Sequence, residues 1–176
     1  MEIGSRYRDN AHVQDYSKKT TIEGVKLIDL KRFHDCGGSF SEIARVQSGL
    51  VDGFDGFEVK QINYSQVSPG AIKAGHYHLN QDDLWFVPPL NRLLIGLKDL
   101  REDSATYENT MRFVMGNGKA ALLFIPRGVL HGTANLWNTE SELIYMVNQN
   151  FDPENADEYR LPAEEFGDHF WEILKG

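Results

Sequence analysis

The distribution of apolar residues along the chain predicts a protein made of short β-strands. Polar and apolar residues alternate over residues 58–64, apart from the polar pair Lys60 and Gln61, as in a strand with one buried face. Four other runs are almost entirely apolar, which predicts strands buried on both faces: 84–87, 93–97, 120–125 and 143–147. Turn-forming residues separate the runs, at 68–70, 88–89, 116–118 and 126–128. Many short strands at a spacing of about ten residues are typical of a sandwich, a jelly roll or a barrel.

Only one segment has the apolar spacing of a helix, and it lies near the C-terminus. Its apolar side chains recur every three to four residues: Phe166, Phe170, Trp171 and Leu174. This spacing predicts a short helix over residues 162–174, and the lack of helices between the strands argues against a parallel α/β sheet. Residues 1–20 are polar and aperiodic and are expected to form an N-terminal arm, followed by one domain over residues 21–176.

Composition and charge exclude several classes of protein. The 176 residues are 41% hydrophobic and 25% charged, as in globular domains, and their formal net charge of −8 argues against a general nucleic-acid or anionic-membrane binder. The longest apolar run, residues 120–125, is far shorter than the ~20 residues that span a bilayer. Cys36 is the only cysteine, so no disulfide framework exists, and residues 1–4 contain no apolar signal core. A cytoplasmic protein without nucleic-acid or membrane partners is expected.

Three of the six histidines form a candidate site. His76 and His78 are two residues apart in a predicted strand, so their side chains share one face. With an acidic group from Asp82 or Asp83, and with His131, they could hold Fe, Mn, Zn or Ni. Alternatively, one histidine is a general base in a metal-free pocket, or all three are hydrogen-bonded structural residues at a barrel mouth. The other three are expected to be surface residues: His12, His34 and His169.

Two segments resemble the paired motifs of the cupin superfamily. The first covers residues 70–83 and carries aspartate where cupins usually carry glutamate, and the second covers residues 126–135. The resemblance implies an all-β fold, a cupin-type jelly-roll β-barrel, to which the short C-terminal helix is added.

Six short motifs in order resemble one branch of the cupins, the dTDP-4-dehydrorhamnose 3,5-epimerase family. They are D-C-G-G-S-F-S-E at 35–42, Q-I-N-Y-S at 61–65, G-A-I-K-A-G-H-Y-H at 70–78, D-L-R-E-D-S-A-T-Y at 99–107, I-P-R-G-V-L-H-G at 125–132, and Tyr145 followed by Pro153 and Glu154. Any one of these motifs is weak evidence, but their order and spacing agree over roughly residues 22–160.

The resemblance implies a metal-free and cofactor-free nucleotide-sugar epimerase or isomerase that acts on a 4-keto-6-deoxy sugar. The ketone acidifies the neighbouring carbons, so a base removes a proton there, and reprotonation from the opposite face inverts the centre. By position, His76 corresponds to the base and Tyr145 to a tyrosine of the pocket, and both are predicted to be catalytic. The predicted substrate-binding residues are Phe40 and Glu42 at the nucleotide base, Gln61 and Asn63 along the phosphate–sugar path, Lys73 in place of a family arginine, His78, Asp83, and His131 beside the sugar.

Several positions depart from the family pattern. Asp83 stands where the family has a lysine, and loss of one oxyanion donor typically costs ~10²–10³ in rate. The family's tyrosine acid aligns with Phe151, or with Asn150 if the alignment shifts by one. His78 replaces a glutamine, and Gly37 replaces an arginine used on the nucleotide. The resemblance places the carboxylate that partners the base in a C-terminal tail, which is expected to be missing here. A metal-dependent cupin enzyme and a non-catalytic nucleotide-sugar-binding cupin are therefore the alternative functions.

A homodimer is the expected assembly. The resemblance implies it, and the open barrel faces together with the aromatic residues Phe54, Phe57 and Trp85 suggest a surface for a second copy. The expected ligand is a nucleotide sugar.

Overall fold

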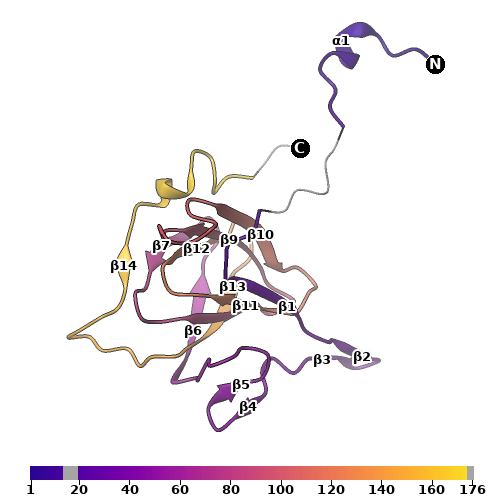
Figure 1. Cartoon of the computed structure of the whole chain (residues 1–176). Helices are drawn as coiled ribbons and strands as arrows, with labels where there is room; N and C mark the ends of the chain where they lie inside the picture. The colour runs from indigo at the N-terminus through magenta and orange to yellow at the C-terminus, as the bar shows by residue number, and fades with distance from the viewer. Residues whose placement is uncertain (14–19, 174–176) are drawn as a thin grey trace.

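A computed structural model describes residues 1–13 and 20–173, and it confirms the predicted all-β class (Figure 1). The body consists of two five-stranded antiparallel sheets. The first sheet contains, in spatial order, β1 (Lys26–Asp29), β11 (Ala121–Ile125), β8 (Asp83–Phe86), β13 (Ser141–Val147) and β6 (Gln61–Val67). The second sheet contains β10 (Thr110–Gly116), β9 (Arg92–Asp99), β12 (Val129–Ala134), β7 (Ile72–Tyr77) and β14 (Tyr159–Arg160). Two small hairpins lie outside the sheets: β2 (Phe33–Asp35) with β3 (Gly38–Phe40), and β4 (Val46–Gln47) with β5 (Leu50–Val51).

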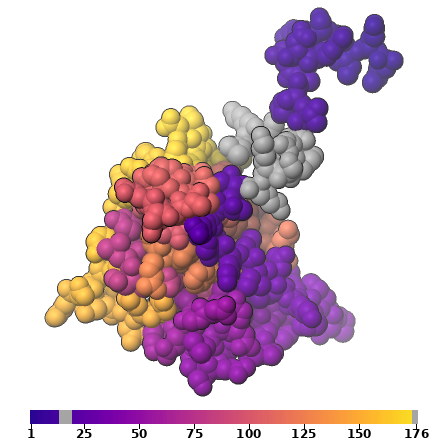
Figure 2. Space-filling model, in the orientation of Figure 1, coloured from indigo at the N-terminus to yellow at the C-terminus, as the bar shows by residue number. Residues whose placement is uncertain are grey.

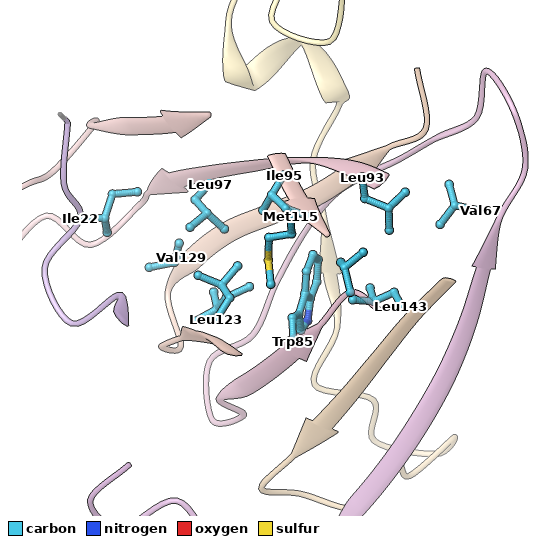
Figure 3. Close-up of a cluster of buried hydrophobic side chains, with 12 residues drawn as sticks. Ile22, Val67, Trp85, Leu93, Ile95, Leu97, Met115, Leu123, Val129 and Leu143 are labelled. Atoms are coloured by element: carbon cyan, nitrogen blue, oxygen red, sulfur yellow. The ribbon is translucent and has the colours of Figure 1, made fainter. Parts of the chain in front are cut away.

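The main core lies between the two sheets. Leu93, Ile95 and Leu97 alternate along β9 and point inward, where none is exposed. Figure 3 shows Ile95 and Leu97 on one side of this core, and Leu123 and Trp85 on the other. Each sheet therefore turns its alternate apolar residues toward the other sheet, as expected for face-to-face packing.

Both faces of β8 are covered, which explains its continuous apolar run. Leu84 and Phe86 point away from the sandwich and pack in a second cluster with Phe54 and Phe57. Because side chains alternate along a strand, Asp83 and Trp85 point between the sheets. This alternation brings a carboxyl group into the interior.

The aromatic residues from which a dimer surface was expected are buried within the chain. Phe54, Phe57 and Trp85 are only 4%, 2% and 2% exposed. They fill the second cluster and the space between the sheets, so that expectation is wrong for these three side chains. The exposed apolar residues lie elsewhere, including Phe33 and Phe40 on the β2–β3 hairpin and Ile62 and Tyr64 on the edge strand β6.

The C-terminal helix is much shorter than the predicted residues 162–174, over the part of them that the structure describes. Only one 3₁₀ turn forms, η1 (Ala163–Phe166), and it ends at Gly167, whose φ of 115° is unfavourable for other residues. The spacing of three to four residues instead builds an aromatic cluster in which the rings of Phe166 and Trp171 have centroids 4.9 Å apart. Trp171 approaches β9 so closely that a Cβ at Gly96 would lie 2.4 Å from its ring. Leu174, the last apolar residue of the pattern, lies outside the described residues.

The N-terminal segment contributes nothing to the core over the residues described. Residues 1–13 are exposed, and the one-turn helix α1 (Ser5–Arg8) buries no side chain. Figure 2 shows these indigo residues outside the body of the two sheets. Residues 14–19 of the predicted arm lie outside the described residues. Within the described part of the chain, no helix is long and apolar enough to span a membrane.

Candidate active site

A cavity of about 610 Å³ opens between the two sheets. Its walls come from β6, β8 and β13 of the first sheet, from β7 and β12 of the second, and from the segment 149–158. Of the ten predicted site residues, the structure brings seven to this cavity: Gln61, Asn63, Lys73, His76, His78, Asp83 and Tyr145. The volume lies within the range of about 300–1,000 Å³ that is usual for small-molecule sites.

Strand β6 supplies a polar wall because its residues alternate. Gln61 and Asn63 face the cavity, whereas Ile62 and Tyr64 face outward and are 65% and 61% exposed. Gln61 Nε2 donates to Asn63 Oδ1 at 2.7 Å, and the Phe151 backbone N–H donates to Gln61 Oε1 at 2.9 Å. These bonds fix the amide of Gln61 and hold the segment 149–158 beside β6.

Lys73 is the one lysine or arginine among the described residues that line the cavity. Its Nζ donates to the Gln66 carbonyl oxygen at 2.6 Å and to Ser65 Oγ at 3.1 Å, which holds the ammonium between β7 and β6. Four carboxyl groups share the cavity with it: Asp83, Asp152, Asp157 and Glu158. Among these lining residues, Lys73 is therefore the side chain that can form an ion pair with an anionic group of a ligand.

Three imidazoles lie close together at the inner end of the cavity. His76 and His131 are register partners on β7 and β12, and their ring centroids are 4.3 Å apart. The ring of His78 lies 6.0 Å from that of His76 and 5.3 Å from that of His131. His131 does not line the cavity, because it is buried behind the other two and is only 1% exposed.

Burial keeps two of these imidazoles neutral at physiological pH. The pKa of His76 is lowered to about 3, first by burial and then by the neighbouring His131, against the raising effect of the Glu158 carboxylate. The pKa of His131 is also lowered to about 3, by burial and by His78. A neutral imidazole has a free lone pair that can accept a proton, which is the state that a general base requires.

The side chain of Asp83 lies among the imidazoles. It is 2% exposed and accepts hydrogen bonds from Gln81 Nε2 at 2.8 Å and from Trp85 Nε1 at 3.0 Å. Burial raises the pKa of Asp83, although His78 and the hydrogen bonds from Trp85 and Gln81 act in the opposite direction. The position at which the family has a lysine thus holds a carboxyl group whose neutral form is favoured by burial.

Tyr145 enters the cavity from the first sheet, whereas His76 enters it from the second. Tyr145 lies on β13, in register with Asn63 of β6 and Trp85 of β8. Burial raises the pKa of its phenol, and the negative charges of Asp83 and Glu158 raise it further. The hydroxyl group is therefore protonated at neutral pH and able to donate.

Phe40 and Glu42 are not brought to this cavity. Phe40 is 66% exposed at the end of the β2–β3 hairpin. Glu42 pairs with Arg45 at 3.1 Å and lines a separate hollow of about 260 Å³. In Figure 1 this hairpin projects at the lower right, whereas β7 and β14 lie at the left.

Several cavity residues were missed by the sequence analysis. Thr133 and Trp85 could have been found, because each lies two residues from a predicted site residue in a strand and so shares its face. Asp157 and Glu158 belong to an irregular segment with no apolar period, so no signal placed them. Asp157 accepts the backbone N–H groups of residues 79–81 at 2.8–2.9 Å, which joins its segment to the loop after His78.

The two sheets and the histidine-lined cavity between them define a cupin-type jelly roll of the sugar-isomerase class. The chain belongs to the dTDP-4-dehydrorhamnose 3,5-epimerase family, whose sequence model matches residues 19–173. The family and the jelly-roll fold that the motifs predicted are both confirmed.

Relatives and a solved structure agree with this assignment. The chain is 40% identical over 141 residues to the spore coat polysaccharide biosynthesis protein SpsL of Bacillus subtilis, covering 80% of this chain and 89% of that protein. It is 32% identical over 143 residues to the "Probable low-salt glycan biosynthesis epimerase Agl13" of Haloferax volcanii, covering 80% and 88%. The dTDP-4-dehydrorhamnose 3,5-epimerase of Sulfolobus tokodaii superimposes with a TM-score of 0.71 at 27% identity, over 86% of this chain and 82% of that one.

Proposed function

We propose that the protein epimerises a nucleotide-linked 4-keto-6-deoxy sugar at a carbon next to the ketone, with His76 as the base and Tyr145 as the acid. The observation that carries the proposal is the position of these two side chains. His76 reaches the cavity from β7 of the second sheet, and Tyr145 reaches it from β13 of the first. A sugar ring held between the sheets has one group on each face, which is the arrangement that inversion requires.

The reaction consists of two proton transfers. His76 accepts the proton from the carbon beside the ketone, and the C–H electron pair moves into an enolate whose negative charge lies on the former ketone oxygen. The Tyr145 hydroxyl then donates its proton to the opposite face of that carbon, and the electron pair returns from the enolate to form the new C–H bond. Solvent returns a proton to the Tyr145 phenolate and removes the one on His76.

Binding of the nucleotide diphosphate is assigned to the polar end of the same cavity. Lys73 supplies a positive charge, and Gln61 and Asn63 supply amide groups along β6. Charge-assisted hydrogen bonds to phosphate contribute more than neutral ones, so Lys73 is the main anchor in this proposal.

Product analysis tests the proposed function directly. The protein is incubated with dTDP-, UDP- and GDP-linked 4-keto-6-deoxyglucose, and the sugar products are identified by NMR. We expect a new epimer at C3, at C5 or at both with at least one of these nucleotides. Binding of all three without any change at either carbon would reject the enzyme in favour of a binding protein.

We further propose that the protein acts as a homodimer in which the β2–β3 hairpin of one chain reaches the cavity of the other. The support is twofold. The hairpin carries two exposed aromatic side chains, Phe33 and Phe40, at 60% and 66% exposure. Phe40 also matches a nucleotide-binding position of the family but lies away from the cavity of its own chain. A cytoplasmic location completes the proposal, supported by a substrate class that is built from cytoplasmic nucleotides.

Mixing two defective variants distinguishes a site completed by the second chain from a site formed within one chain. Phe40→Ala removes a stacking partner for the nucleobase, worth about 1–3 kcal/mol, so turnover below the KM should fall about 5- to 150-fold. His76→Asn removes the general base that abstracts the proton. After the two variants are unfolded and refolded together, half of the dimers are mixed and each has one intact site, which restores about a quarter of wild-type activity. Activity no higher than the sum of the separate variants would show that each hairpin serves its own chain.

A further inference from the structure

Three imidazoles in the cavity meet the geometric requirement for a metal site. One ring nitrogen from each of His76, His78 and His131 can be chosen so that all three lie within 4.8 Å of one another. Nitrogens bound to a single Zn²⁺ at about 2.1 Å are at most about 4.2 Å apart. Side-chain rotations that move each nitrogen by a fraction of an ångström would therefore bring all three to one ion.

The hydrogen bonds of His131 and His78 leave the same ring nitrogen free for a cation. Val129 offers His131 a carbonyl oxygen 2.9 Å from Nδ1, so Nδ1 carries the proton and Nε2 carries the lone pair. His78 likewise donates from Nδ1 to the backbone oxygen of Asp157. Metal-binding histidines typically donate their other ring N–H to a carbonyl or carboxylate, which fixes the ring and its tautomer.

One of these free nitrogens has no partner at all among the described residues. His131 Nε2 is buried and accepts no hydrogen bond, although a buried polar atom without a partner is costly. The nearest carboxyl oxygen is Asp83 Oδ2, at 3.7 Å, and Asp83 Oδ1 lies 4.0 Å from His78 Nε2. A positive ion between these two groups would accept the lone pair of His131 Nε2 and pair with the carboxyl group of Asp83.

The remaining contacts show what the ion would displace. Gln81 Nε2 lies 3.3 Å from His78 Nε2 and also donates to Asp83 Oδ1. A bound ion replaces this weak bond to His78, while the amide keeps its bond to Asp83. Three imidazole ligands favour a transition metal over Mg²⁺ or Ca²⁺, which prefer oxygen ligands.

We propose that His76, His78 and His131 bind one divalent transition-metal ion such as Zn²⁺ or Co²⁺, with Asp83 balancing its charge, and that this ion switches off proton abstraction. The second half of the proposal rests on the proposed function. His76 lines the cavity and is the proposed base, and a lone pair engaged with a metal cannot accept a proton. The metal-free protein is then the active form, and the metal is an inhibitor rather than a cofactor.

Titration of the chelator-treated protein with Co²⁺ tests binding without reference to activity. We expect one ion per chain and visible absorption bands of Co²⁺ held by nitrogen ligands. His78→Gln, which places the family's residue in the site, should weaken binding at least about tenfold, the lower end of the cost of losing even an outer-shell partner. His76→Asn should weaken it as well. The matched control is His169→Gln, because the His169 side chain is 77% exposed and outside the cluster, and it should bind as the wild type does.

Two results would overturn the proposed site. One is that His78→Gln and His76→Asn both bind Co²⁺ as tightly as the wild type does, provided that each variant retains the wild-type melting temperature. The other is loss of the Co²⁺ bands in His169→Gln. Inhibition is measured separately, since one equivalent of Co²⁺ should stop hydrogen exchange into the sugar and a chelator should restore it. Full exchange by the metal-loaded protein would reject the inhibitory role, whereas absence of exchange in the metal-free protein would reject the proposed function and not the metal site.

Discussion

Replacement of His76 by asparagine should lower the rate of deuterium exchange into a bound 4-keto sugar by at least ~10², the usual scale of a lost general base. Asparagine keeps a polar side chain in the cavity but offers no nitrogen lone pair to accept the proton. His76 is also the only one of the three clustered imidazoles that both lines the cavity and lies in register with the buried His131. The rate is measured by NMR in heavy water, from loss of the sugar proton next to the ketone.

The control for this result is His169→Asn, which changes a histidine on the surface and should leave the rate unchanged. The melting temperature of His76→Asn and its affinity for the nucleotide should stay close to the wild-type values, because the side chain is partly exposed to the cavity rather than part of the core. Exchange at more than a tenth of the wild-type rate would show that another group removes the proton.

Replacement of Tyr145 by phenylalanine should separate the two proton transfers. The variant lacks only the hydroxyl group, so the base still removes the proton while its replacement from the opposite face loses the donor. We expect formation of the epimer to fall by ~10²–10⁴, the range for a general acid, and deuterium exchange to fall less than about tenfold. Both rates come from one NMR time course in heavy water.

Tyr64→Phe is the matched control for this variant. Tyr64 lies on the outer face of β6, where its hydroxyl group donates to Glu142 Oε1 at 2.9 Å, so loss of that hydroxyl should leave both rates unchanged. Equal losses of exchange and epimer formation in Tyr145→Phe would assign Tyr145 to binding. Unchanged epimer formation would move the donor to another group in the cavity.

The sequence predicted the strands well because burial on one or two faces produces distinct patterns. The alternation predicted over residues 58–64 overlaps β6, which begins at Gln61 and ends at Val67. The continuous run 84–87 corresponds to β8, whose outer face is covered by Phe54 and Phe57. The aromatic spacing near the C-terminus predicted a longer helix than the single 3₁₀ turn that forms, because packing between rings produces the same spacing. Rings that pack on one another, as Phe166 and Trp171 do, repeat every few residues whether or not the backbone between them is helical.

The candidate site was predictable where strands carry it and unpredictable where loops do. The i, i+2 rule placed His76 and His78 together, but the pairing of His76 with His131 depends on the register of β7 and β12. No local pattern predicted that Asp157 and Glu158 would reach the cavity. Phe40 matched a family motif, yet it lies exposed on the β2–β3 hairpin and away from this cavity, because a motif specifies residue types and not the course of the backbone that carries them.

In the proposed reaction, a protein base in this cavity removes a proton next to a sugar ketone. The most direct measurement is an NMR time course of the chelator-treated wild-type protein with dTDP- and GDP-linked 4-keto-6-deoxy sugars in heavy water. Because protonated His76 exchanges its proton with solvent and can return deuterium to the original face, while Tyr145 delivers it to the opposite face, we predict that deuterium enters beside the ketone at least as fast as epimer accumulates. If both nucleotide sugars bind and neither acquires deuterium, the protein is a binding cupin and no base in this cavity removes the proton.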